Sequence, residues 1–233
     1  MKDYQAENLK LLKNDISAIC KRSGRDENEI TLVAVSKTFS VSDILRVHSA
    51  GQLDFGENKV QELKEKHAEL TDENIRWHLI GHLQTNKVKY ISDFVHLIHS
   101  VDSEKLANEI QKQAEKTNRI INVLVQVNAS GENQKSGVRT NSAEKLCSYI
   151  ENLSKVNVQG LMTIGMLTDD RDVIRENFKA LKNIYDELKT GFKDFRYLSM
   201  GMTSDFDIAI EEGSNMLRIG SAIFGNRNYT SVS

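Results

Sequence analysis

The sequence predicts an α/β protein, a single (β/α)8 TIM barrel with an extra N-terminal helix. Three observations favour this fold. Short apolar segments alternate with amphipathic segments along residues 31–220, which is the pattern of parallel strands joined by right-handed crossovers. Eight apolar segments occur, the number that closes a barrel, and the length of 233 residues is close to the about 250 residues typical of one. No linker or low-complexity segment divides the chain, so residues 1–233 are expected to form one domain.

The extra helix is expected before the first strand, over residues 3–22. Its apolar side chains recur at the spacing of one helical face: Leu9, Leu12, Ile16 and Ile19. Ser23 and Gly24 interrupt this pattern, and glycine commonly ends a helix. The segment is therefore expected to turn there into the first strand.

The eight expected strands are short and mostly apolar, as buried parallel strands are. They are TLVAVSK (31–37), QLDFG (52–56), RWHLIG (76–81), VHLIHSVD (95–102), INVLVQVNAS (121–130), NVQGLMTIG (157–165), FRYLSMG (195–201) and NMLRIG (215–220). A doubly wound open sheet is the alternative arrangement. It would be favoured by a G-x-G-x-x-G turn after the first strand, and the sequence has no such turn there.

Seven amphipathic segments between these strands are expected to form the outer helices. They are VSDILRVHSAG (41–51), NKVQELKEKHAEL (58–70), QTNKVKYISDF (84–94), SEKLANEIQKQAEK (103–116), NSAEKLCSYIENL (141–153), DVIRENFKALKNIYDELK (172–189) and SDFDIAIEEG (204–213). The first of them has Ser42 or Asp43 near its N-cap and Gly51 at its end. Because the chain contains no proline, its turns depend on Gly, Asn, Asp and Ser.

Composition excludes several classes of function. Lys and Arg number 31 against 33 Asp and Glu, a formal net charge of −2, which argues against nucleic acid or an anionic membrane as a partner. No apolar run reaches the roughly 18 residues of a membrane span, and the N-terminus lacks the apolar core of a secretory signal. The two cysteines cannot build a disulfide framework. A cytoplasmic location is therefore expected.

Polar residues gather where the expected strands end. A parallel barrel carries its active face at the C-terminal ends of its strands. In chain order these ends supply Lys37, Glu57, Asn58, Gly81, His82, Asp102, Asn128, Thr163, Ser199, Met200, Gly201, Arg218, Gly220 and Ser221. Each residue alone is compatible with an ordinary strand end that meets water, but together they predict a hydrogen-bonding rim.

The last two strand ends resemble a phosphate site. Barrels often bind phosphate with the loops after strands seven and eight. Here SMGMTSD (199–205) precedes a helix, and RIGSAIFGN (218–226) supplies a glycine and a serine. Glycines allow backbone N–H groups to approach an anion, and hydroxyl groups add donors. A pair of ordinary turns would contain the same types of residue, so spacing alone leaves both possibilities open.

Lys37 is the candidate reactive group. A lysine at a barrel mouth with its stem against apolar neighbours can have a lowered pKa, and a neutral amine can form a Schiff base with a carbonyl. A surface lysine or a partner in a salt bridge is the competing interpretation. An aldolase-type Schiff base without any cofactor is a further one.

Two other motifs favour structural roles. His78 and His82 are four residues apart, but a strand running into a glycine turn does not align them as a helix would, so no metal site is expected. Glu57 and Asp102 could form an acid/base pair. Anchoring of helix N-termini or rim hydrogen bonds explains them as well.

Taken together, eight segments resemble the YggS/PROSC family of pyridoxal 5′-phosphate (PLP) homeostasis proteins. They are AVSKT (34–38), FGENKVQEL (55–63), WHLIGHLQTNK (77–87), HSVDS (99–103), QVNASGENQKSGV (126–138), GLMTIG (160–165), LSMGMTSDFDIAI (198–210) and LRIGSAIFGNR (217–227). The segments cover nearly the whole chain in order. The sequence departs from the family pattern at Ser40 and Gly165, where relatives commonly carry proline, and at Lys59, where tyrosine is usual.

The resemblance implies a barrel similar to the N-terminal domain of bacterial alanine racemase, with PLP as its cofactor. It implies these cofactor-binding residues: Lys37, Asn58, Ser199, Met200, Gly201, Arg218, Gly220 and Ser221. Lys37 would carry PLP as a covalent aldimine, Arg218 would face the pyridine nitrogen, and Asn58 would lie beside the ring. The remaining five would hold the phosphate. No catalytic residue and no metal ligand is implied.

Two functions remain to be weighed. The first is PLP homeostasis, in which the protein holds the cofactor and releases it to PLP-dependent apo-enzymes. The alternative is a PLP-dependent amino-acid racemase. An arginine beside the pyridine nitrogen leaves it unprotonated, which makes the ring a weaker electron sink. Similar racemases also use a tyrosine from a second domain, for which this chain is expected to have no room; Tyr229 is a conceivable substitute. The sequence therefore favours a carrier without established turnover, as a monomer or a weak homodimer.

Overall fold

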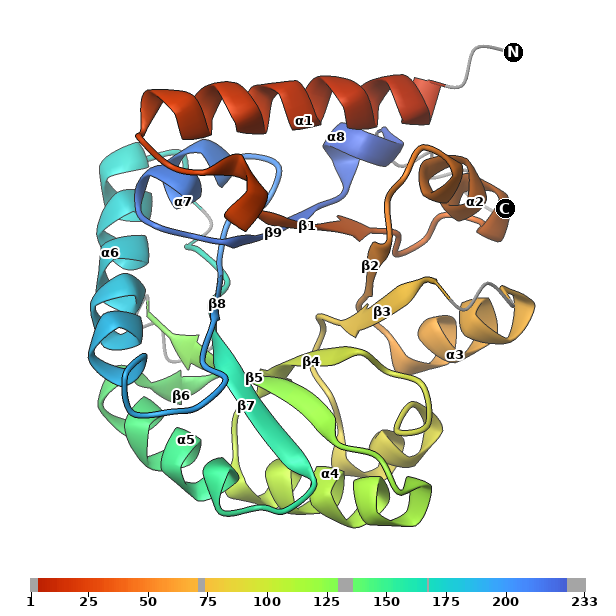
Figure 1. Cartoon of the computed structure of the whole chain (residues 1–233), viewed down its shortest axis with the longest axis vertical. Coiled ribbons are helices and arrows are strands. Elements are labelled where there is room, and N and C mark those ends of the chain that lie inside the picture. Colours follow the sequence, from red (N-terminus) through yellow and green to blue (C-terminus); the bar gives the residue numbers. More distant parts are fainter. Residues whose placement is uncertain (1–3, 71–73, 130–135, 167, 226–233) are drawn as a thin grey trace.

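The structure, a computed structural model, describes residues 4–70, 74–129, 136–166 and 168–225. Eight parallel strands form a closed barrel, which confirms the predicted fold (Figure 1). The strands are β1 (Thr31–Val35), β2 (Asp54–Glu57), β3 (Arg76–Leu79), β4 (Leu97–Val101), β5 (Ile121–Asn128), β7 (Val156–Met162), β8 (Tyr197–Ser199) and β9 (Met216–Ile219). Neighbouring strands pair in the order β4-β3-β2-β1-β9-β8-β7-β5, and a further pairing of β4 with β5 closes the ring.

The outer layer follows the predicted alternation with one change. Its helices are α2 (Val41–Ser49), α3 (Val60–Glu69), α4 (Glu104–Thr117), α5 (Ala143–Glu151), α6 (Arg171–Leu188) and α7 (Phe206–Glu211). The segment expected as a helix over 84–94 instead forms the 3-10 helix η2 (Thr85–Tyr90). Val88 and Ile91 are both fully buried, and their separation of three residues matches the three residues per turn of a 3-10 helix.

The structure also contains short elements that the sequence pattern did not predict. They are η1 (Glu27–Glu29), β6 (Val138–Arg139), η3 (Thr140–Ser142) and α8 (Ser221–Phe224). β6 pairs with the end of β5, where Val127 and Asn128 are its partners. α8 follows β9 directly, so it lies next to the C-terminal rim of the barrel.

The extra N-terminal helix is α1 (Tyr4–Arg22). It packs against α2, α7 and α8, and so it covers the outside of the barrel where the last strand meets the first (Figure 1). Its buried face contains the apolar residues that predicted it, among them Leu9, Leu12, Ile16 and Ile19. The helix before β1 thus covers this part of the barrel together with α8, the short helix that follows β9.

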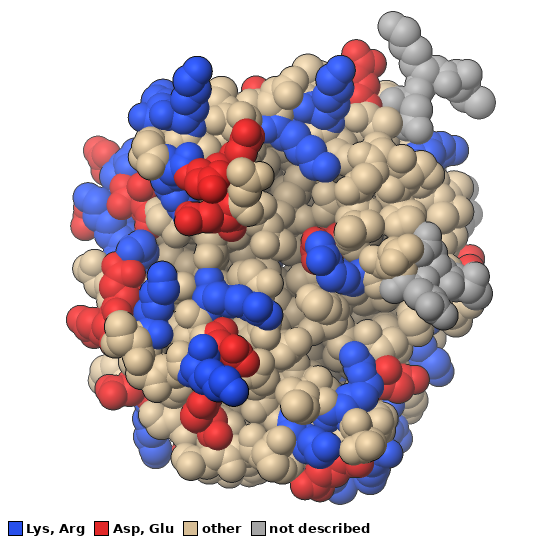
Figure 2. Space-filling model, in the orientation of Figure 1, with Lys and Arg blue, Asp and Glu red and all other residues tan. Residues whose placement is uncertain are grey.

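The barrel separates two cores. A large apolar core lies between the strands and the helices, and a small one lies among inward-facing strand residues: Val33, Leu97, Leu124, Met162 and Met216. Charged side chains of both signs are intermingled over the face shown in Figure 2, in line with the near-zero net charge. Among the described residues no helix is both long and apolar enough to cross a bilayer.

Candidate functional site

A cavity of about 690 Å³ opens at the C-terminal ends of the barrel strands. This volume is within the range of small-molecule sites. Its wall includes residues from the loops after β1, β2, β3, β7 and β8, together with the ends of β5 and β9. Parallel strands bring these segments, which are far apart in the sequence, to one rim, as the rule for barrels predicts.

The wall carries two basic side chains. Lys37 lies on one side of the cavity wall, just after β1, and Arg218 lies in β9. The two strands are neighbours, and Arg218 is the register partner of Val33. Among the described residues that line the cavity there is no Asp or Glu. The electrostatic environment therefore favours an anionic ligand.

Five of the eight expected cofactor-binding residues line the cavity: Lys37, Asn58, Arg218, Gly220 and Ser221. The other three, Ser199, Met200 and Gly201, are buried behind the wall. Inward-facing residues alternate along a strand, and Ser199 points into the barrel interior below the rim. The chain then turns at Gly201, with φ 96°, where a Cβ atom would come within 2.6 Å of the Ala209 side chain.

The residues that follow this turn reach the cavity instead. Met202, Thr203 and Ser204 line it, and the Ser221 hydroxyl donates a hydrogen bond to the Thr203 hydroxyl at 3.2 Å. Hydroxyl groups from the loops after β8 and β9 therefore meet at the rim. Sequence reasoning did not single out Thr203 and Ser204, although their hydroxyl groups, two and three residues after a glycine, were the available signal.

The Arg218 guanidinium is held from inside the barrel. Its side chain donates hydrogen bonds to the Ser199 hydroxyl at 2.6 Å and to the Thr163 carbonyl oxygen at 2.7 Å. Burial lowers the pKa of Arg218 to about 10, although the charge of Asp205 opposes this, so the group stays protonated at neutral pH. A guanidinium has five N–H donors, and the two bonds leave donors that can face the cavity.

Two buried histidines continue this network away from the cavity. The Ser199 hydroxyl is 3.4 Å from His99 Nδ1, and His99 Nε2 is 2.9 Å from His78 Nδ1. His78 Nε2 is in turn 2.9 Å from Asp54 Oδ1. The chain of contacts runs from the end of β8 to the first residue of β2, through the barrel interior. Arg218 is thereby connected to the opposite end of the barrel.

Donor and acceptor roles along this chain follow from its ends. At one end Asp54, as a carboxylate, can only accept, and at the other end Arg218 donates to the Ser199 hydroxyl. Burial lowers the pKa of His99 well below its usual value, and a neutral imidazole has one donor and one acceptor. His78 Nε2 therefore donates to Asp54, a neutral His78 accepts at Nδ1 from His99 Nε2, and His99 Nδ1 accepts from the Ser199 hydroxyl. Every group in the chain is satisfied by one orientation.

Lys37 occupies a tight turn at the end of β1. The Phe39 amide donates to the Ser36 carbonyl oxygen at 3.0 Å, which makes Lys37 and Thr38 the two central residues of a β-turn. Thr38 has φ 70°, in the left-handed region that turns usually fill with glycine or asparagine. The lysine side chain is half-buried at the cavity wall.

The remaining polar candidates have other partners. Glu57 is fully buried and faces α3 rather than the cavity, where it pairs with Lys66 at 2.7 Å. Asp102 lies 4.0 Å from His82, which lines the cavity. The Thr163 hydroxyl donates to the Val127 carbonyl oxygen at 2.8 Å. Glu57 and Asp102 do not meet as an acid/base pair, and Tyr229 lies outside the described residues.

A cluster of possible metal ligands lies at the other end of the barrel. Ligand atoms of Asp54, His78 and His96 come within 4.8 Å of one another. Both Asp54 carboxylate oxygens accept hydrogen bonds from Arg76, at 2.8 and 2.6 Å, and one of them also accepts from His78. The carboxylate is thus engaged by an arginine, whose positive charge opposes a cation. We assign Asp54 and His78 to the interior hydrogen-bond chain, and the His96 ring lies beside the His78 ring, with centroids 5.3 Å apart.

Comparison with known proteins identifies close relatives. Residues 8–228 match the family model of the alanine racemase N-terminal domain. A pyridoxal phosphate homeostasis protein of Aquifex aeolicus is 42% identical over 224 residues, which cover 96% of this chain and 98% of that one. A protein of the same name from Escherichia coli K12 is 37% identical, with 97% of each chain covered.

Solved structures give the same result at the level of the fold. PipY of Synechococcus elongatus PCC7942, in a structure with PLP bound, superposes with a TM-score of 0.81 at 32% identity, covering 95% of this chain and 100% of that chain. A protein of Bifidobacterium adolescentis described as unknown gives 0.90 at 35% identity, covering 96% and 97%. Alanine racemase of Clostridium difficile gives 0.76 at 16% identity, with 96% of this chain but only 57% of the racemase covered.

Proposed function

Since the chain belongs to the pyridoxal phosphate homeostasis proteins, within the alanine racemase N-terminal domain family, we propose that it binds PLP in the cavity at the C-terminal end of its barrel. The observation that carries this proposal is the charge of the cavity wall. A lysine and an arginine face a space whose described lining contains no carboxylate, and hydroxyl groups of two loops meet beside it. Such a wall suits a ligand with both an anionic group and an aldehyde.

The residues present fit this cofactor. Thr203, Ser204, Gly220 and Ser221 would hold the phosphate, because their hydroxyl and backbone N–H groups can donate to its oxygens. Gly220 also allows the chain after β9 to pack closely against the end of β1, because a Cβ atom there would lie 3.1 Å from the Val35 carbonyl oxygen. The expected contacts of Ser199, Met200 and Gly201 would then be indirect, through the backbone turn that presents the next three residues.

The other contacts concern the ring and the aldehyde. Arg218 would present N–H donors to the pyridine nitrogen while Ser199 and Thr163 hold its guanidinium, and Asn58 would lie beside the ring. Lys37 would bind the aldehyde as a Schiff base. In that step the amine nitrogen bonds to the aldehyde carbon, and the aldehyde oxygen leaves as water with the two amine protons. PLP supplies its reactive aldehyde, and the protein supplies position and charge.

Replacement of Lys37 tests the covalent assignment. Wild-type protein mixed with PLP is expected to turn yellow, and borohydride is expected to fix the cofactor on the peptide that contains Lys37. Lys37→Ala is expected to abolish both the absorbance band and the fixed adduct. The control is Lys59→Ala, an exposed lysine after the next strand, which is expected to behave as wild type. An unchanged adduct in Lys37→Ala would refute the Schiff-base assignment.

We further propose that the protein stores PLP and releases it to apo-enzymes. A cationic Arg218 has no acceptor for a proton on the pyridine nitrogen, so the ring is a weak electron sink and turnover of amino acids is disfavoured. Loaded protein mixed with a PLP-dependent apo-enzyme is expected to restore that enzyme's activity faster than spontaneous loss of PLP into buffer. Absence of transfer, together with racemisation of an amino acid by the loaded protein, would favour the racemase alternative.

A further inference from the structure

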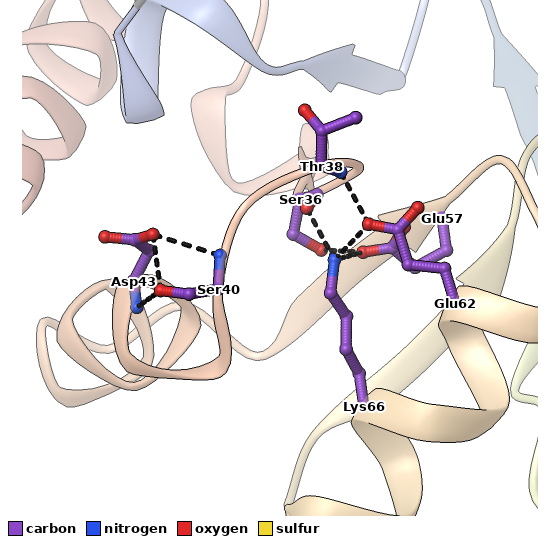
Figure 3. A network of polar contacts seen from close by, with 7 residues as sticks. All are labelled: Ser36, Thr38, Ser40, Asp43, Glu57, Glu62 and Lys66. Atoms are coloured by element: carbon purple, nitrogen blue, oxygen red, sulfur yellow. Dashed lines mark hydrogen bonds and ion pairs between the residues drawn. The ribbon is translucent and has the colours of Figure 1, made fainter. Parts of the chain in front are cut away.

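An ion cluster that is buried except for part of Glu62 lies directly beneath the turn that carries Lys37 (Figure 3). It consists of Glu57 at the end of β2 and of Glu62 and Lys66 on α3. The Lys66 ammonium donates to Glu57 Oε1 at 2.7 Å, to Glu62 Oε1 at 2.7 Å and to the Ser36 carbonyl oxygen at 2.8 Å. The exposed fraction of the side chain is 8% for Lys66 and 0% for Glu57. All three ammonium donors are therefore used inside the protein.

This cluster contacts the main chain on both sides of Lys37. The carbonyl oxygen that accepts from Lys66 belongs to the peptide group that precedes Lys37. The amide of the peptide group that follows Lys37, the Thr38 N–H, donates to Glu62 Oε1 at 2.5 Å. The Ser36 hydroxyl also donates to Glu57 Oε1 at 2.6 Å. Fixing both flanking peptide groups fixes the backbone dihedral angles of the lysine, and so the direction in which its side chain leaves.

The arrangement is costly for the free energy of folding. Buried ion pairs are often no more stabilising than apolar residues of the same volume, because their desolvation offsets their attraction. Glu57 Oε2 is buried and meets no hydrogen-bond donor in the described part of the chain. Burial raises the pKa of Glu57 even though Lys66 opposes the shift. Thr38 adds a strained left-handed conformation of the kind that concentrates at functional sites. Stability alone does not account for these features.

We propose that Glu57, Glu62 and Lys66 form a positioning cluster that aims the Lys37 amine at the ligand aldehyde by holding the two peptide groups around it. This inference rests on the proposed function of Lys37 and adds the residues that place it. Because Glu57 is followed by Asn58, which lines the cavity, the same cluster also links the part of the cavity rim after β2 to the part after β1. The cluster does not line the cavity, so it acts through Lys37 and not on the ligand itself.

Substitution of Glu62 tests this inference with the least damage to the fold. Glu62→Ala removes the acceptor of the Thr38 amide and is expected to slow borohydride-trappable capture of PLP on the order of tenfold to a hundredfold. Glu62→Gln keeps an acceptor oxygen and is expected to restore most of the rate. The matched control is Glu65→Ala, on the same helix but exposed and bonded to Gln61, which is expected to leave the rate unchanged.

A second ligand separates positioning from a general structural role. Pyridoxamine 5′-phosphate has the same ring and phosphate but no aldehyde, so it cannot bond to Lys37. Its affinity is expected to stay unchanged in Glu62→Ala while covalent capture falls. The rate at which acetic anhydride labels Lys37 in the ligand-free protein is expected to change in the same variant. This measurement does not involve PLP. Equal losses of capture and of pyridoxamine phosphate affinity would indicate a general structural role and overturn the inference.

The outcomes also separate this inference from the proposed function. If wild-type protein fails to capture PLP, the proposed function is wrong. If wild type captures PLP and Glu62→Ala captures it at the same rate, the positioning inference is wrong and the function stands. Lys66→Met is the more drastic variant, because it leaves the Glu57 carboxylate buried without its cation. The Glu62 variants decide the question even if Lys66→Met does not fold.

Discussion

At the scale of single residues, the interior histidines are the part of the site that the pattern of apolar residues does not predict. His78 and His99 sit on strands that are otherwise apolar, and both side chains are almost fully buried. With both rings neutral, the Asp54 carboxylate sets the direction of their hydrogen bonds, because it can only accept. A neutral His99 therefore holds Ser199, which in turn holds the guanidinium at the cavity.

This assignment predicts the protonation of His99. In protein labelled with ¹⁵N-histidine, His99 is expected to carry its proton on Nε2 and none on Nδ1. Because burial lowers its pKa well below 6.5, its nitrogen chemical shifts are expected to stay constant from about pH 8 to about pH 5.5. The exposed His82 serves as the internal comparison. A proton on Nδ1, or a midpoint near 6.5, would contradict the proposed orientation of the chain.

At the scale of secondary-structure elements, glycines allow strands to approach each other below the rim. Gly160 in β7 has φ 144°, and a Cβ atom there would lie 1.8 Å from the Tyr197 carbonyl oxygen of β8. The pairing of β7 with β5 shifts register between Val123 and Val125, close to this point. β7 and β8 lead to Thr163 and Ser199, the two residues that hold Arg218.

Replacement of Gly160 is therefore expected to destabilise the folded protein strongly. Gly160→Ala is expected to lower the free energy of unfolding by about 3 kcal/mol, because the strands must separate and the residue must keep a strained backbone. The control is Gly191→Ala in the exposed turn after α6, where the added atom would meet only the Leu188 carbonyl oxygen at 3.4 Å. That change is expected to stay within about 0.5 kcal/mol. Urea denaturation of both variants measures the difference, and similar losses would contradict the interpretation.

At the scale of the whole molecule, the buried histidines make folding depend on pH. Burial lowers the pKa of His96 from 6.5 to about 4, and it lowers that of His99 well below 6.5. The unfolded chain therefore binds more protons than the folded protein below about pH 6.5. Burial alone would raise the pKa of Asp54, but the hydrogen bond from His78 and the charge of Arg76 lower it, so its contribution is lost only at more acidic pH.

Stability is accordingly expected to fall in two stages on acidification. Between about pH 6.5 and pH 4 the free energy of unfolding is expected to fall, with at most about 3 kcal/mol from His96. A further loss is expected below pH 3.8, as Asp54 takes up a proton. Chemical denaturation at a series of pH values measures the profile, and His96→Gln is expected to flatten the first stage. If the free energy of unfolding of His96→Gln falls with the same slope between about pH 6.5 and pH 4, groups other than His96 cause the first stage.

By itself, the sequence determined the barrel, its extra helix and the group of residues at the strand ends. These features depend on the alternation of apolar and amphipathic segments. This alternation is a local property of the sequence and can be recognised without knowledge of the contacts. The position of Lys37 after an apolar strand and of Gly220 and Ser221 after the last one followed from the same alternation. Helix boundaries were less well determined: the N-cap of α2 is Ser40, in a capping box with Asp43, whereas Ser42 or Asp43 was the expected N-cap.

Only the tertiary structure decided which side of the barrel each polar residue faces. Glu57 faces α3 because successive residues of a strand point to opposite faces, and its partner Lys66 lies nine residues later, on that helix. The turn at Gly201 set Ser199 behind the cavity and Thr203 in its wall. The contact of His78 with His99 required two strands to pair in a particular register. Register and loop conformation arise from contacts between distant segments, and no local pattern encodes them.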